Sequence, residues 1–242
     1  MENTEEATSE PQGSADITDI TAASDLILDV KDETRDQTFS YRVSTIQLKQ
    51  ASPYFASLLD PHKFGEGARV DKELRQLKKK YDDFASVPAD QLPRVSISDV
   101  GRISRVNSIK PLMSDFLCAL HGLELSTPNP PIPNLANIAI VADRFDALPF
   151  IAHYMRRKRF FQAIDAKTKG KSTSLNEERG RQKIFIGLLL DYPPWVSIYS
   201  KRLIIGGSVQ WKPDVEEDLE AALWWDLPRG IEGNELTVRS GL

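Results

Sequence analysis

The residues that could carry out chemistry are few and scattered in this chain. It has three histidines, His62, His121 and His153, and a single cysteine, Cys118. No histidine stands at metal-ligand spacing from another histidine or from the cysteine. The sequence therefore predicts no metal site and no cofactor. His121 falls near the end of an apolar helical stretch, where we expect a core or capping role.

Neither a reactive cysteine nor a nucleotide loop is predicted. Cys118 lies between Leu117 and Ala119 without a cationic neighbour in the sequence, which favours a buried structural thiol. The run Gly170-Lys171-Ser172-Thr173 ends like a phosphate-binding loop, but Asp165 stands where that loop needs its first glycine. A Gly-x-Ser-x-Gly elbow is missing as well. We predict that the chain is not an enzyme, although distant residues could still converge in space.

Four consecutive basic residues, Arg156-Arg157-Lys158-Arg159, allow two interpretations. They could form the solvated end of a helix, where cations complement the helix dipole. They could instead serve as a nuclear import signal or contact phosphates. The whole chain has 31 basic and 35 acidic residues and a net charge of -4, so we do not expect nucleic acid as a partner.

Length and composition predict one sizeable domain with extensions. The chain has 242 residues, of which 40% are hydrophobic. One cysteine excludes an internal disulfide, and no apolar run approaches the roughly 18 residues of a membrane span. With no apolar leader segment either, we expect an intracellular protein, cytoplasmic or nuclear.

The hydrophobic pattern predicts strands first and helices afterwards. Alternating or β-branched runs favour strands at residues 25–30, 38–43 and 94–98. Apolar residues at three- and four-residue steps favour helices at residues 46–59, 111–122, 135–147 and 150–155. Within the first of these, Ser52-Pro53 marks a fresh helix start, because serine supplies a capping oxygen and proline suits the first helical position.

Composition also predicts where this core is interrupted. Residues 1–24 hold six acidic and no basic side chains, which is typical of a disordered tail. Residues 60–92 form a polar insertion with a short exposed helix at 72–81, and residues 161–175 read as a basic flexible linker. Residues 176–242 contain all four tryptophans and two apolar helical runs, so we expect a helical extension docked on the domain.

Three blocks in this order resemble the BTB/POZ domain family. The first comprises Leu48, the run Ser52-Pro53-Tyr54-Phe55 and Leu58-Leu59, and the others are residues 113–122 and 141–148. The resemblance covers about residues 25–160. It implies an α+β fold with a small sheet packed on a helical bundle, acting as a protein-protein interaction module. The tryptophan-rich remainder resembles extensions of fungal-type members.

The resemblance also implies a partner-binding surface. Family members that recruit a cullin scaffold of ubiquitin ligases carry a hydrophobic-x-Glu triplet after the Ser-Pro-x-Phe helix, and Phe64-Gly65-Glu66 falls in that place. With the helix residues Tyr54, Phe55 and Leu58, Phe64 and Glu66 form the candidate site of an adaptor. A plain loop is the alternative for the triplet, and core burial is the alternative for Phe55 and Leu58.

The sequence departs from the family at the dimer pocket. A basic pair is usual where this chain has Ser44 and Thr45, and in dimeric members that base joins an acidic residue matched here by Asp25. This leaves homodimerisation open, and Asp25 could instead cap or solvate the strand start. A nuclear regulatory scaffold that acts through self-association is the alternative function.

Overall fold

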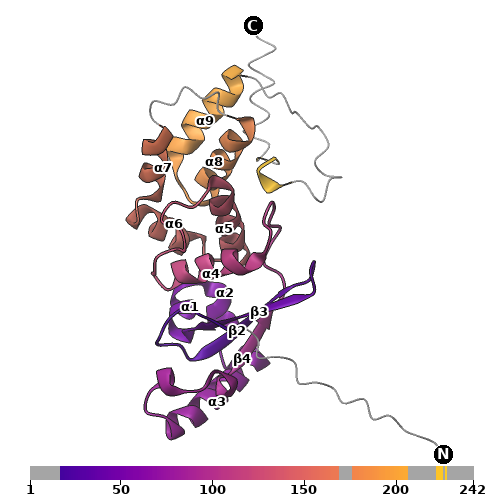
Figure 1. Cartoon of the computed structure of the whole chain (residues 1–242), viewed down its shortest axis with the longest axis vertical. Coiled ribbons are helices and arrows are strands. Elements are labelled where there is room, and N and C mark those ends of the chain that lie inside the picture. Colours follow the sequence, from indigo (N-terminus) through magenta and orange to yellow (C-terminus); the bar gives the residue numbers. More distant parts are fainter. Residues whose placement is uncertain (1–16, 169–175, 207–221, 226, 228–242) are drawn as a thin grey trace, which may run out of the picture.

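A four-stranded mixed sheet and a set of helices make up the computed structural model, which describes residues 17–168, 176–206, 222–225 and 227 (Figure 1). The strand order is β1-β3-β2-β4. The strands are β1 Ile17–Asp19, β2 Leu26–Asp32, β3 Gln37–Val43 and β4 Arg94–Ile97. β2 and β3 form an antiparallel hairpin, while β1 pairs with β3 and β4 pairs with β2 in parallel. The predicted hairpin and third strand are therefore confirmed.

Both faces of the sheet are covered, which explains why β2 is apolar along most of its length. Leu28 and its same-face neighbours join the main core, whereas Ile27 points to the other face and contacts a smaller cluster with Leu77. Leu77 belongs to α3, Gly65–Lys80. Side chains alternate between the two faces of a strand, so one apolar strand serves two separate cores.

Two short helices follow the hairpin, as the sequence predicted. They are α1, Thr45–Ala51, and α2, Pro53–Leu58. The side chain of Ser52 accepts a hydrogen bond from the backbone N–H of Phe55 at 3.1 Å and donates one to the carbonyl of Phe145 at 2.6 Å. One buried hydroxyl thus caps α2 and ties it to the later helices.

Two parts of the chain that were predicted to be disordered or flexible are ordered. β1 lies within the predicted tail, because its backbone pairs with the free edge of β3 and Ile20 behind it is buried. The predicted linker begins with α7, Phe160–Thr168, because the buried ring of Phe161 stacks on Tyr192 at 4.2 Å. Residues 1–16 and 169–175 lie outside the described residues.

The polar insertion forms a longer helix than predicted. α3 has 16 residues and starts seven residues earlier than expected, at Gly65. Leu77 is buried in the small cluster with Ile27, and Val70 belongs to the main core. The short helical turns η1, Phe84–Ser86, and η2, Ala89–Gln91, complete this layer. The insertion is thus the cover of one sheet face, at the lower end of the molecule in Figure 1.

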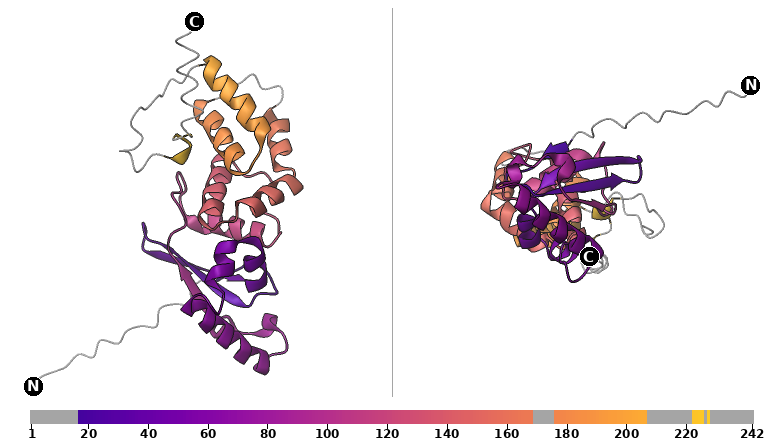
Figure 2. Two further views of the ribbon diagram at one scale, coloured as in Figure 1. Left: turned by 180° about the vertical axis from the view of Figure 1, so that it is seen from behind. Right: turned by 90° about the horizontal axis from the view of Figure 1, so that it is seen from below.

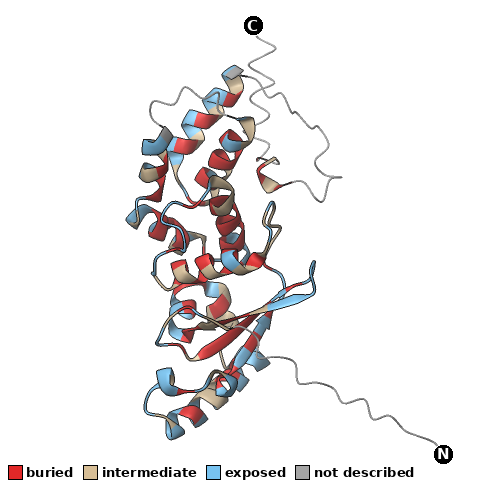
Figure 3. Cartoon of the chain, viewed as in Figure 1, coloured by how far each residue is buried: buried red, intermediate tan, exposed pale blue. Residues whose placement is uncertain are grey.

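The remaining helices extend the core away from the sheet. They are α4 Ile109–Leu120, α5 Ile132–Arg144, α6 Leu148–Arg157, α8 Glu177–Leu189, α9 Pro193–Gly206 and the turn η3 Leu223–Trp225. Figures 1 and 2 show an elongated chain with α3 at one end and α9 at the other. Buried residues continue from β2 to α8 in Figure 3.

The described part of the tryptophan-rich extension docks on the domain, as predicted, and residues 207–221, 226 and 228–242 lie outside the described residues. Trp195 and Trp224 are fully buried in the same core as the sheet residues, and α8 lies against α5. The indole N–H of Trp224 donates to Glu178 at 3.1 Å. Among the described residues, no helix is long and apolar enough to cross a membrane.

Candidate partner-binding surface

The two aromatic residues of α2, Tyr54 and Phe55, differ in how deeply they are buried. Phe55 is fully buried, with its ring stacked on Phe145 at 5.2 Å and edge-on to Tyr54 at 5.3 Å. Phe55 is therefore a core residue, and its assignment to a partner-binding site is wrong. Tyr54 and Leu58 are half-buried and stand four residues apart on the same side of the helix.

A tight turn carries the chain from α2 into α3. The carbonyl of Asp60 accepts hydrogen bonds from the backbone N–H groups of Lys63 at 3.2 Å and Phe64 at 3.5 Å. Gly67 packs directly on this carbonyl, because a Cβ built on Gly67 would lie 2.3 Å from the Asp60 oxygen. The side chain of Lys63 returns to α2 and donates to the Ser57 hydroxyl at 3.3 Å.

This turn presents Phe64 and Glu66 together at the start of α3. Phe64 is the N-cap residue with extended backbone, and its side chain is 51% exposed. Glu66 is exposed in the first helical turn, where the helix dipole favours a carboxylate. The triplet is thus a helix start rather than a plain loop. We call Tyr54, Leu58, Phe64 and Glu66 the α2–α3 surface.

One exposed residue was missed at the sequence level. Ile46 was counted among the apolar residues of the predicted helix at 46–59, yet it is 61% exposed. The buried members of α1 are Thr45, Leu48 and Ala51. Ile46 stands two residues before Leu48, and side chains two residues apart point to different sides of a helix, so Ile46 faces away from the core.

The three altered dimer-pocket positions meet in space. Asp25 accepts hydrogen bonds from the backbone N–H and the hydroxyl of Thr45, both at 2.7 Å. The backbone N–H of Ser44 donates to Nε2 of His121 at 3.0 Å, and Nδ1 of His121 lies 2.7 Å from the carbonyl oxygen of Leu117. Asp25 therefore caps the start of α1, whereas the sequence predicted that it caps or solvates the start of the strand.

His121 is the member of this cluster that sequence reasoning did not connect to Asp25. It is the C-cap residue of α4, followed by Gly122 at a φ of 71°, which confirms the capping role. Burial lowers the pKa of the imidazole below its ordinary value, while the bond to Leu117 and the charge of Asp25 act in the opposite direction. An Nε2 that accepts a backbone N–H must be unprotonated.

Two members of the basic run make specific contacts. Arg156 donates to the carbonyl of Leu190 at 3.0 Å and to the carboxylate of Asp191 at 3.1 Å, which joins α6 to the α8–α9 turn. Lys158 pairs with Glu124. Arg157 and Arg159 are exposed. The run is therefore partly a helix end that holds the extension, and nuclear import stays a prediction.

A buried lysine links the last three long helices. Lys183 of α8 is 2% exposed, and its Nζ lies 3.2 Å from Asp165 of α7 and 2.5 Å from the Tyr199 hydroxyl of α9. Its Nζ also lies 4.7 Å from the ring centroid of Trp195, whose indole N–H donates to Asp165 at 3.0 Å. The charge is paired and hydrogen-bonded, so we assign a structural role.

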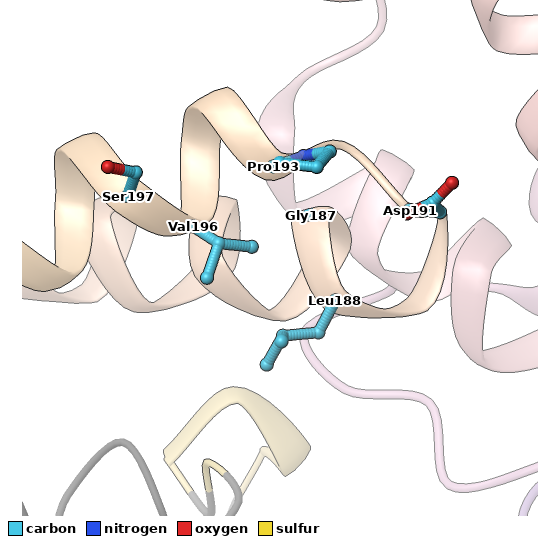
Figure 4. Close-up of a pocket in the computed structure, with 6 residues that line it drawn as sticks. All are labelled: Gly187, Leu188, Asp191, Pro193, Val196 and Ser197. Atoms are coloured by element: carbon cyan, nitrogen blue, oxygen red, sulfur yellow. The ribbon is translucent and has the colours of Figure 1, made fainter.

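A shallow pocket lies where α8 turns into α9 (Figure 4). It has a volume of about 380 Å³, and its lining residues are Gly187, Leu188, Asp191, Pro193, Val196 and Ser197. In Figure 4 the side chains of Leu188 and Val196 point one way, whereas Asp191 and Ser197 point elsewhere. The described lining thus offers an apolar patch formed by Leu188 and Val196.

Comparisons with known proteins find no relative of this chain. No family model matches the chain, and neither a curated protein nor a solved structure matches it.

Proposed function

We propose that the chain is a BTB/POZ-like protein-interaction module that presents the α2–α3 surface to a cullin scaffold of ubiquitin ligases. The exposed ring of Phe64, next to the carboxylate of Glu66 at a fixed helix start, is the observation that carries the proposal. Its support is the hydrophobic-x-Glu triplet in the sequence together with the placement of that triplet. The tryptophan-rich extension, or another chain, would select the substrate.

The geometry suits an interface anchor. A phenylalanine ring can bury on the order of 150 Å² or more in a partner's pocket, and a carboxylate beside it sets the register. The Asp60–Gly67 contact holds both residues in position before binding, so little conformational entropy is lost on association. Tyr54 and Leu58 on α2 are half-buried apolar side chains that a partner seated on Phe64 would have to reach separately.

The test is binding of the full chain to a purified cullin scaffold protein. We expect Phe64→Ala to weaken binding by about 2 kcal/mol, or roughly 30-fold in Kd, as anchors do on truncation. Glu66→Ala should weaken it less, because the carboxylate is exposed and screened.

The matched control is Ile205→Ala on α9, at the opposite end of the molecule. Ile205 is 75% exposed, so this variant also removes an exposed apolar side chain. It should bind like the wild type. Equal binding by Phe64→Ala and wild type, or no binding by the wild type, would refute the cullin assignment.

A further inference from the structure

The solvent side of α3 carries a stripe of cations. Lys72, Arg75, Gln76 and Lys79 recur at i, i+3, i+4 and i+7, so they share one face of the helix, and all four are exposed. The opposite face buries Val70 and Leu77. From residue 74 to the end of α3 the helix has four cations and no carboxylate. The chain as a whole has a net charge of -4, so this part of α3 is locally positive in a negatively charged protein.

Few of these cations are neutralised locally. Asp71 pairs with Arg75 at 2.8 Å, and Glu73 pairs with Arg69 at 3.4 Å. Among the residues that the structure describes, Lys72, Lys78 and Lys79 make no ion pair. A few cations at a helix C-terminus complement its dipole, but Lys72 lies in the middle of the helix, outside that effect.

The acidic N-terminal stretch joins the fold at the buried side of α3, across the helix from this stripe. Ile17, the first residue of β1, contacts the same small apolar cluster as Leu77 and Tyr81. The preceding residues contain five carboxylates and no lysine or arginine; the carboxylates are Glu2, Glu5, Glu6, Glu10 and Asp16. The charge that complements the α3 stripe is therefore tethered to the same helix and has to pass around it to reach the stripe.

We propose that the acidic stretch at residues 2–16 docks in cis on the cationic face of α3 formed by Lys72, Arg75 and Lys79. Reach is sufficient: the seven residues from Glu10 to Ile17 span up to about 25 Å, and Lys72 to Lys79 covers about 10 Å of helix. Each exposed ion pair is weak, but tethering supplies an effective concentration in the millimolar range. The stretch then competes with acidic partners for α3.

The proposal is tested by paramagnetic relaxation enhancement on the full chain. A nitroxide label goes on Ser9→Cys in a Cys118→Ala background, and backbone amide intensities are compared in the oxidised and reduced states. We expect at least a twofold loss at residues 72–80, with no loss in α9. About 0.5 M salt should abolish the loss, because it shortens the screening length.

Matched charge variants decide whether the lysine face is responsible. Lys72→Gln/Lys79→Gln should abolish the effect, whereas Lys49→Gln/Lys201→Gln, which removes two exposed lysines elsewhere, should preserve it. A second measurement needs no cysteine substitution. It compares the backbone amide chemical shifts of residues 72–80 between the wild type and the triple variant Glu5→Gln/Glu6→Gln/Glu10→Gln.

Three results would overturn the proposal. They are uniform broadening, broadening that persists in Lys72→Gln/Lys79→Gln, and broadening that arises between separate chains in a mixed sample. The last would mean that the acidic stretch docks on a second copy.

Discussion

Replacing Gly67 by alanine tests the close contact between Gly67 and the backbone of Asp60 in the turn between α2 and α3. Alanine is the better helix former by about 1 kcal/mol, so propensity alone predicts stabilisation. The structure predicts the opposite. The new Cβ would lie 2.3 Å from the carbonyl oxygen of Asp60 and 2.6 Å from its carbonyl carbon, and both atoms belong to backbone that cannot rotate away.

The expected size follows from this overlap. The turn must open by roughly 1 Å to restore ordinary contact, and overpacking of this kind typically destabilises by about 1–3 kcal/mol. For a chain of this length, that corresponds to a fall in Tm of about 2–12 °C. Urea unfolding followed by tryptophan fluorescence measures the free energy, and a circular dichroism melt measures Tm.

Gly65→Ala is the matched control in the same helix. A Cβ at Gly65 would meet no atom within 4 Å, so this variant should be neutral or stabilised by about 0.4–1 kcal/mol through the unfolded chain. If Gly67→Ala proves as stable as Gly65→Ala, the close contact with Asp60 is wrong. The positioning of Phe64 by that contact would then fail with it.

Two further predictions concern buried polar groups. Lys183→Ala should lower the free energy of unfolding in urea by about 3 kcal/mol, because it removes a buried charge and leaves the partners of that charge unpaired. The control Lys201→Ala, at an exposed position, should change the free energy by no more than about 0.5 kcal/mol. Equal effects of the two variants would contradict the structural role of Lys183. Burial lowers the pKa of His121 in the folded chain, so the unfolded chain binds a proton at this residue more readily. The neutral imidazole therefore contributes stability that is complete above the ordinary pKa of 6.5 and is lost as the pH falls below 6.5. Urea unfolding at pH 7.5 and 5.5 should show this loss in the wild type and a smaller one in His121→Gln; an unchanged pH dependence in the variant would assign it to other groups.

Local elements could be read from the sequence because their causes are local. Ser52-Pro53 predicted the start of α2, and the structure shows the capping bond that those two residues make possible. The change from alternating to helical spacing after Val43 likewise marks the end of the hairpin. The long helices of the extension followed from their apolar periodicity and from the proline pair at Pro193.

Elements that depend on distant partners were missed. β1 has three residues and owes its order to the backbone of β3, more than twenty residues away. α7 lies in a basic stretch, and one of the contacts that hold it, the stacking of Phe161 on Tyr192, joins residues 31 positions apart. Neither contact leaves a periodic trace in the sequence, because each is made by a partner that spacing does not reveal.

By itself, the sequence determined which residues share a helix face and which residues begin a helix. It also showed Phe64 and Glu66 two residues apart, and it showed Ser44 and Thr45 at the positions where the BTB/POZ resemblance leads one to expect a basic pair. Only the tertiary structure decided that Phe55 is core and that His121 reaches Ser44. The physical reason is that burial depends on what covers a residue, and the covering elements come from distant parts of the chain.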